Sequence, residues 1–380
     1  MRNAVYWLSP WASRNMSSLV AALTIATHRE RAPAGKLCHL QALRGLAASL
    51  VVLTHSVRAL HGDYSGRFSV PGYFGVAAFF IISGFIIYKT SRSAFGSHKG
   101  ATDFITKRLI RIFPIYWIAT ILLIVLSPHR AAYGASDIIC SLLLIPHYIA
   151  LNDGMDPLLG PAWTLHYELL FYVFFAASMV FNRRTGVALT VMALAALALC
   201  GLLVRPESDA TGPLTLLQYY SRPIIMLFPI GIGLGLLEEQ RYRFVVPLPF
   251  VTMMAILAGW LWYSVFGSSL TESDQLEFPF ILIIWSACAL MVFVGIFGRS
   301  TRGWFEAAAE AFGDASYSVY LFHIFILAAL VRLNFQTAHP ILFVATALVG
   351  ANVFGYAIFI YVEKPILAQA RRALLGPVVK

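Results

Sequence analysis

The stretch from Leu43 to Ser56 reads LRGLAASLVVLTHS and places two ionisable side chains, Arg44 and His55, in an otherwise apolar segment. At about 100° per residue, their separation brings both onto one face of a helix, about 16 Å apart along its axis. A cation inside a bilayer costs roughly 2.5–3.5 kcal/mol on insertion scales. The stretch therefore predicts a membrane helix whose polar face has a function that offsets this cost.

The composition sets the class of protein. The chain has 380 residues, of which 59% are hydrophobic and 12% charged, and its mean hydropathy is +0.74. These values exclude a soluble globular domain and predict an all-α integral membrane protein. We interpret the net charge of +10 as a signal of membrane orientation, not of nucleic-acid binding. The four cysteines lack metal-ligand spacing, so we expect no metal site.

Hydropathy predicts about ten transmembrane helices in one bundle. The apolar piece at 138–151 is too short to cross and contains Pro146, so it is expected to be re-entrant or interfacial. With ten spans, 21 of the 28 Lys and Arg residues fall on the cytoplasmic side, which predicts that both termini are cytoplasmic. The predicted spans are 38–60, 71–88, 112–126, 163–181, 187–204, 222–237, 244–266, 278–297, 316–335 and 340–362.

Three segments follow from this reading of the chain. Residues 1–36 form a basic N-terminal cytoplasmic extension, in which Met16 is an alternative start to Met1. Residues 37–366 form the transmembrane domain, and 367–380 form a basic cytoplasmic tail. We find no internal repeat, so the spans are expected to form one unit.

Two polar residues lie at matching depth in the predicted spans. Of the acidic residues, Glu168 alone is predicted to lie clearly inside a span, about five residues from the outer end of that span. His55 lies at the same depth in the first span. A lone buried histidine is as often a structural residue with satisfied hydrogen bonds as a functional one. A histidine and a carboxylate at the same depth in the membrane, by contrast, favour a catalytic base and the residue that orients it. His166 faces away from Glu168 on the same helix and is predicted to be structural.

The inner side of the bundle shows the opposite charge. In TKRLIRIFPIYW, Arg108 and Arg111 lie three residues apart on one helical face, with Lys107 beside them. The guanidinium fork suits phosphate oxygens, although basic residues at an inner helix end are also ordinary topology anchors. Arg44 lies too deep for an anchor unless its side chain snorkels to the interface. The three arginines therefore favour a phosphate-rich cytosolic donor, such as coenzyme A, whose reactive end reaches His55.

Six motifs in order resemble the signatures of the membrane-bound acyltransferase-3 family and together cover about 37–366. Lys364 stands where the family usually has arginine. The motifs are LQALRGLAASLVVLTHS, GYFGVAAFFIISGFIIY, KRLIRIFPIYW, PAWTLHYELLFY, FGDASYSVYLFHIFI and YVEKPI.

The resemblance implies a multi-pass protein of the bacterial cytoplasmic (inner) membrane. Such a protein moves an acyl group, commonly acetyl from acetyl-CoA as co-substrate, to a hydroxyl of a carbohydrate such as a surface polysaccharide or lipid-linked glycan. By resemblance His55 is the catalytic histidine, Arg44 is its partner in the motif, Arg108 and Arg111 are the cytoplasmic pair, and Glu168 is the motif carboxylate. No cofactor metal is implied.

Several alternatives stay open at this point. The acyl group either passes directly to the acceptor or first forms an acetyl-histidine at His55. We expect the stand-alone form of the family, without an appended hydrolase-like domain, and delivery to partner proteins of a polysaccharide assembly pathway is compatible with it. The rival class is a transporter or flippase for lipid-linked sugars, since intramembrane Arg, Glu and His also mark substrate pathways. Its usual sign, broken helices in two repeated halves, is not evident.

Overall fold

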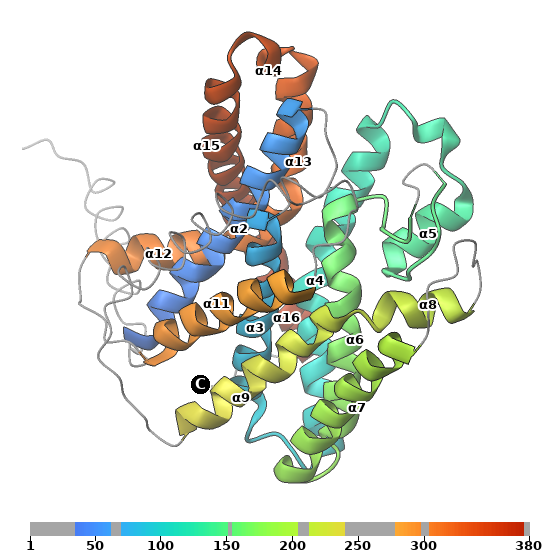
Figure 1. Cartoon of the computed structure of the whole chain (residues 1–380), viewed down its shortest axis with the longest axis vertical. Helices are drawn as coiled ribbons and strands as arrows, with labels where there is room; N and C mark the ends of the chain where they lie inside the picture. The colour runs from blue at the N-terminus through green and yellow to red at the C-terminus, as the bar shows by residue number, and fades with distance from the viewer. Residues whose placement is uncertain are drawn as a thin grey trace, which may run out of the picture. The chain divides into compact units, whose positions relative to one another are not determined.

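The computed structural model describes residues 35–61, 70–150, 154–203, 213–239, 278–297 and 304–375. All regular secondary structure in these residues is helical, which confirms the predicted all-α class (Figure 1). The longer helices are α2 (Gly35–His61), α3 (Val70–Ser91), α4 (His98–Leu126), α5 (Ala135–Leu143), α6 (Trp163–Ser178), α7 (Arg183–Leu203), α8 (Pro213–Tyr220), α9 (Leu227–Glu239), α11 (Phe278–Phe297), α12 (Trp304–Asp314), α13 (Ser316–Arg332), α15 (Pro340–Ile358) and α16 (Lys364–Leu375).

Every predicted span except 244–266 overlaps one of these helices, and 244–266 lies outside the described residues. The bent pair α12 and α13, which meet at 62°, adds one candidate span to the five helices that are long and apolar enough to cross a membrane. The structure is thus that of a membrane protein with several spans, whereas the total of ten and the location of the termini stay predictions. The five helices are Cys38–Leu60, Val70–Ser91, His98–Leu126, Arg183–Gly201 and Pro340–Leu374.

The short apolar segment predicted at 138–151 begins as helix α5. This helix has nine residues, which gives a length of about 14 Å, less than half the thickness of a bilayer core. It ends at Leu144, whose φ of 53° is left-handed. Tyr116 and Trp117 on α4 donate hydrogen bonds of 2.5 and 2.8 Å to carbonyl oxygens in its last turn. Since α4 satisfies these carbonyls, the segment packs against α4 without the length to cross.

Helix α4 is longer than its predicted span, which began at residue 112. It starts at His98, because the side chain of Ser97 accepts a hydrogen bond from the backbone N–H of Gly100 and caps the first turn. Hydropathy detects the apolar part of such a helix and misses its polar beginning. Arg108 and Arg111 therefore lie in the middle of a continuous helix, with a fixed spacing on one face.

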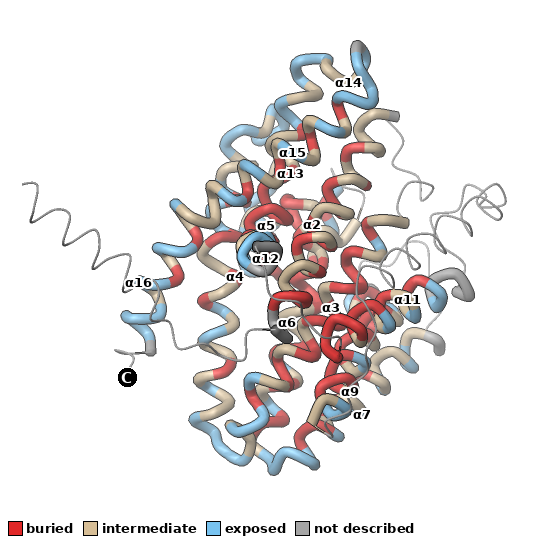
Figure 2. Tube along the Cα trace, turned by 90° about the vertical axis from the view of Figure 1, so that its left-hand side faces the viewer, coloured by how far each residue is buried: buried red, intermediate tan, exposed pale blue. Residues whose placement is uncertain are grey.

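Helices α3 and α9 pack at very short distance, and both are largely buried (Figure 2). A Cβ on Gly84 of α3 would lie 2.2 Å from the carbonyl oxygen of Phe228, and one on Gly231 of α9 would lie 2.1 Å from that of Ile81. Small residues permit this approach of two helix backbones in a membrane. The contact fixes α3, whose other side carries Ser83 and faces the cavity described below.

Helices α13 and α15 lie side by side and are joined through the short helix α14 (Phe335–Ala338) (Figure 1). Helix α15 continues through a π-helical turn, Phe359–Glu363, into α16. The predicted span ended at residue 362 and left Glu363 outside. In the structure Glu363 is fully buried within this continuous helical run. Glu363 is therefore a second carboxylate, besides Glu168, that lies among the apolar helices.

The packing of α3 on α9 generates a matched test. Gly231→Ala should destabilise the protein by about 1–3 kcal/mol, because the new methyl group would overlap the backbone of α3. Gly233→Ala, two residues along the same helix, has open space around the added methyl group and should leave stability unchanged. Thermal unfolding of the two purified variants in detergent measures the difference. Equal melting temperatures would contradict the close packing.

Candidate active site

The described helices surround a partly open cavity of about 1060 Å³. Residues of α2, α3, α4, α6, α12, α13 and α16 line it, so its walls come from both ends of the described chain. Its lining contains three carboxylates, Asp103, Glu168 and Asp314, against a larger set of cationic side chains. The cations are Arg44, Lys107, Arg108, Arg111, Arg371 and Arg372. The cavity therefore has a net positive charge.

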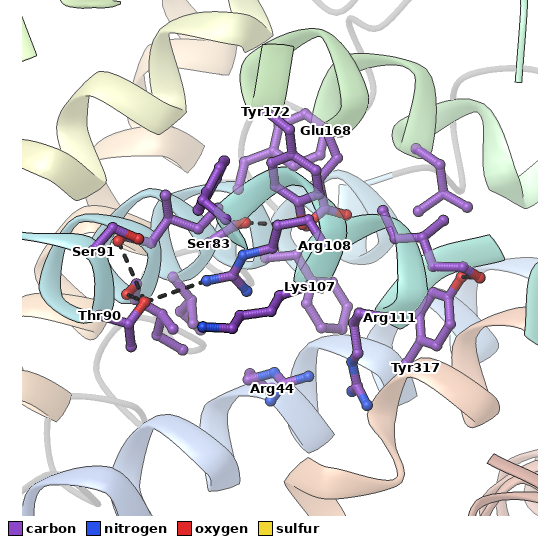
Figure 3. A pocket seen from close by; sticks show the side chains of 18 of the residues that line it. Arg44, Ser83, Thr90, Ser91, Lys107, Arg108, Arg111, Glu168, Tyr172 and Tyr317 are labelled. Atoms are coloured by element: carbon purple, nitrogen blue, oxygen red, sulfur yellow. Dashed lines mark hydrogen bonds between the residues drawn. The ribbon is translucent and has the colours of Figure 1, made fainter. Parts of the chain in front are cut away.

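The three arginines predicted to bind the donor all line this one cavity, and Figure 3 shows their side chains together with Lys107 around the same space. Arg44 donates a hydrogen bond of 2.9 Å from Nη1 to Oε1 of Gln41 on its own helix. Gln41 in turn donates to Asp314 at 2.6 Å. A hydrogen-bonded chain thus connects the cation of Arg44 to a carboxylate of α12, in accord with the requirement that a buried charge finds a partner.

Arg108 and Arg111 have different surroundings although they share one face of α4. Arg108 lies over the rings of Phe104 and Tyr172, with 5.5 and 5.9 Å from its guanidinium carbon to the ring centroids, and donates a 3.3 Å hydrogen bond to Thr90. These are neutral contacts that hold the side chain against the wall without neutralising it. Arg108 thus keeps its full charge toward the cavity.

Arg111, by contrast, is neutralised by Glu363. The two side chains form an ion pair, and the second carboxylate oxygen of Glu363 accepts a 2.6 Å hydrogen bond from Ser318 on α13. The guanidinium carbon also lies 5.5 Å from the ring centroid of Tyr317. A buried carboxylate with both oxygens bonded in this way ties α4, α13 and the π-helical turn at one point.

Glu168 lies in the cavity wall on α6, where it accepts hydrogen bonds from side chains and forms no ion pair with any described residue. Its Oε1 accepts hydrogen bonds from Ser83 at 3.1 Å and from the hydroxyl group of Tyr172 (Figure 3). Because Tyr172 also lies beneath Arg108, the carboxylate is one residue removed from that cation. The structure thus brings Glu168 together with the donor arginines.

His55 does not line the cavity, and its predicted pairing with Glu168 is absent from the structure. Within the described residues, His55 Nδ1 contacts the carbonyl oxygen of Val51 at 2.9 Å and Nε2 of His323 at 3.3 Å. Equal depth on two helices does not make two side chains neighbours, because the helices also rotate about their axes. The side chain that contacts the His55 ring is therefore another histidine, His323 on α13.

Tyr320 lies between the cavity and the two histidines. It lines the cavity, and its hydroxyl group donates to the carbonyl oxygen of Pro161 and accepts from Thr164 at 2.8 Å. Its ring centroid is 6.5 Å from that of His323, three residues further along α13. The cavity therefore ends one helical turn from the histidine pair.

The environment of His166 agrees with the structural role predicted for it. His166 is buried, and its Nδ1 lies 2.8 Å from the hydroxyl group of Tyr219 on α8. This contact points away from Glu168, as the spacing of two residues on a helix predicted.

Sequence reasoning missed five residues of this region. Glu363 and His323 stand in motifs that were recognised, and each is the partner of a predicted site residue, so the motifs themselves were the available signal. Asp314 stands in the same motif as His323, whereas Arg371 and Arg372 carried no such signal. The two arginines were assigned to a basic tail, and only the turn from α15 into α16 places them at the cavity.

These apolar helices around a polar, cationic cavity define a helical membrane protein with an internal site for a polar ligand. The chain belongs to the membrane-bound acyltransferase-3 family, since the family's acyltransferase domain matches residues 39–360. It is therefore a membrane-bound acyltransferase that transfers groups other than aminoacyl groups.

A named relative is similar over most of the chain. The exopolysaccharide production protein ExoZ of Rhizobium meliloti is 29% identical over 327 residues, which span 83% of this chain and 96% of the relative. No solved structure is significantly similar to the chain.

The Arg111–Glu363 ion pair generates a prediction for stability. Glu363→Ala should cost about 3 kcal/mol, the lower end for a broken buried pair, because Arg111 retains 26% exposure and some hydration. Glu239→Ala, which breaks exposed pairs to Arg92 and Arg183, should cost less than about 1 kcal/mol. Thermal unfolding in detergent compares the two variants. An equal effect would show that the buried pair does not hold the helices together.

Proposed function

We propose that the protein transfers an acyl group, in the first instance acetyl, from acyl-CoA to a hydroxyl of a bacterial polysaccharide or lipid-linked glycan. The family supports acyl transfer, and the exopolysaccharide production protein among its relatives supports a polysaccharide acceptor. The observation that carries the proposal is a cationic cavity that ends at Tyr320, one helical turn from the His55–His323 pair.

The charge balance of the cavity supports a polyanionic donor. Arg111 is paired with Glu363, and Arg44 is linked to Asp314 through Gln41. The cavity's other four cations, by contrast, form no ion pair with any described residue. Like charges gathered in one cavity repel each other, and bound phosphate groups would remove that cost. We therefore assign the donor's phosphates to these four side chains, Lys107, Arg108, Arg371 and Arg372.

His55 is the base in this proposal. Its imidazole takes the proton of the acceptor hydroxyl while the hydroxyl oxygen attacks the carbonyl carbon of the thioester. The carbon–sulfur bond breaks, and the thiolate of the donor leaves and takes the proton back from the imidazolium. The products are an ester and a free thiol, and His55 returns to its starting state. Glu168, held by Ser83 and Tyr172 beside Arg108, acts on the donor side of the site.

The proposal includes the orientation predicted from charge. The donor enters from the cytoplasm, the acceptor approaches His55 from the opposite side, and the protein lies in the bacterial cytoplasmic membrane with proteins of a polysaccharide assembly pathway as its partners. A flippase would also use intramembrane Arg and His, but membership of an acyltransferase family disfavours it.

Donor binding gives the first functional prediction. Arg108→Ala should weaken CoA binding by about tenfold to a hundredfold, since a charge-assisted hydrogen bond is worth about 1.5–3 kcal/mol. The double variant Arg371→Ala/Arg372→Ala removes two such groups and should weaken it by about 10²–10⁴-fold. S-acetylpantetheine lacks the nucleotide phosphates and should bind all variants equally. Calorimetry on purified protein measures both ligands.

The control for donor binding is Arg183→Ala, an exposed arginine that pairs with Glu239 outside the cavity. It should bind CoA like the native protein. Native CoA affinity in all the cavity variants would show that the donor does not bind in this cavity.

The chemistry gives the second functional prediction. His55→Ala should lower acetyl transfer by about 10²–10⁴-fold, the usual effect of removing a general base, and should leave CoA affinity intact because His55 is outside the cavity. His166→Ala should keep most of the activity. Transfer of radiolabel from acetyl-CoA to a purified glycan acceptor measures the rate. A native protein that transfers no label would support the flippase, and a fully active His55→Ala variant would exclude His55 as the base.

A further inference from the structure

His323 is a buried imidazole that contacts the proposed base. It lies on α13 with no exposed surface, and its ring centroid is 5.0 Å from that of His55. Its Nδ1 lies 2.8 Å from the carbonyl oxygen of Tyr320, and its Nε2 lies 3.3 Å from Nδ1 of His55. Both ring nitrogens of His323 therefore have a defined neighbour.

These neighbours fix where the protons are. A carbonyl oxygen only accepts hydrogen bonds, so Nδ1 of His323 must carry a hydrogen. A neutral imidazole has one N–H, and Nε2 of His323 is then an acceptor aimed at His55. The carbonyl oxygen of Val51, 2.9 Å from Nδ1 of His55, makes the same demand on that ring. The two assignments agree, because the N–H of His55 faces a lone pair of His323.

The lone pair of His55 is consequently on Nε2. The Nδ1–H is shared between Val51 and His323, and a shared hydrogen explains why the contact between the two rings is as long as 3.3 Å. Nε2 is the nitrogen left to receive a proton from the acceptor.

We infer that His323 is a positioning residue for acyl transfer, which holds His55 with its lone pair on Nε2 and accepts a hydrogen bond from the imidazolium that forms during the reaction. The inference rests on the proposed function. The proton moves from the acceptor hydroxyl to Nε2 of His55 and then to the leaving thiolate, while the N–H of His323 stays on Tyr320. His323 thus ends each cycle unchanged and never contacts the substrate.

A neutral partner suits this position better than a carboxylate. His323 lies among buried residues of α13, where an ionised side chain without its own counter-charge would cost several kcal/mol. A neutral imidazole with both nitrogens hydrogen-bonded avoids that cost and still offers a lone pair. The base therefore keeps an orienting acceptor without a second buried charge.

Two substitutions separate the acceptor role from a packing role. The side-chain carbonyl of His323→Gln reaches the place of Nε2 and can accept from His55, whereas the shorter amide of His323→Asn can donate to the Tyr320 carbonyl but leaves His55 without its acceptor. We expect the Gln variant to keep most of the native kcat. The Asn variant should lose about 10–100-fold, the loss typical of removing a group that orients a functional imidazole.

The pH profile gives a measurement that a packing role would not change. Without its acceptor, the protonated form of His55 is less stable, so the acidic limb of kcat should move to lower pH in the Asn variant and stay in place in the Gln variant. Among the described residues, the other titratable groups near this pair are Arg58, which acts on His55, and Tyr320, whose ring lies near that of His323, and both are the same in the two variants. A difference between the two profiles therefore reports the side chain at position 323.

The matched control is His166→Asn, which also replaces a buried, hydrogen-bonded imidazole and lies away from His55. It should change neither kcat nor the pH of the acidic limb of kcat. Native CoA affinity in every variant shows that the fold is kept. Equal rates for the Asn and Gln variants, or an unmoved limb in the Asn variant, would overturn the inference. A failure of the proposed function differs from this result, since the native protein itself would then transfer no acetyl group.

Discussion

A charge enclosed by apolar helices must meet an opposite charge, and the ion pair of Arg111 with the buried Glu363 satisfies this constraint. The pair joins the middle of α4 to the π-helical turn between α15 and α16, and Ser318 adds α13 to the same point. Segments far apart in the chain are held together there. The direction in which α16 leaves the turn then decides that Arg371 and Arg372 reach the cavity.

The same pairing determines the charge that a ligand meets. Arg111 and Arg44 contribute mainly to the structure, because a carboxylate compensates each of them directly or through Gln41. The positive charge that remains comes from α4 and α16 on the cavity wall. An arginine that the sequence marks as unusual is thus not always the one available to bind a ligand, and in the proposed function its uncompensated neighbours bind the donor.

The cavity and the histidine pair are distinct regions separated by one helical turn of α13. Tyr320 belongs to both, since its hydroxyl group is fixed at the cavity end by Thr164 and its backbone carbonyl fixes the tautomer of His323. A donor with a polyanionic head and a narrow reactive arm matches this arrangement. In the proposed function, charge recognition and proton transfer take place at different ends of one path, and neither set of residues has to satisfy both demands.

The sequence by itself determined the class of protein and most of its helices, because hydropathy depends on composition alone. The spacing of Arg108 and Arg111 on one helix is a local property, and the sequence also grouped Arg44 with them by its predicted depth; all three line the cavity. The motifs further determined the family. How helices rotate and pack was left to the tertiary structure, which gave His55 the partner His323 in place of Glu168. The fold also placed Glu363 inside the bundle and brought Arg371 to the cavity, because side chains distant in sequence become neighbours only through the packing of whole helices.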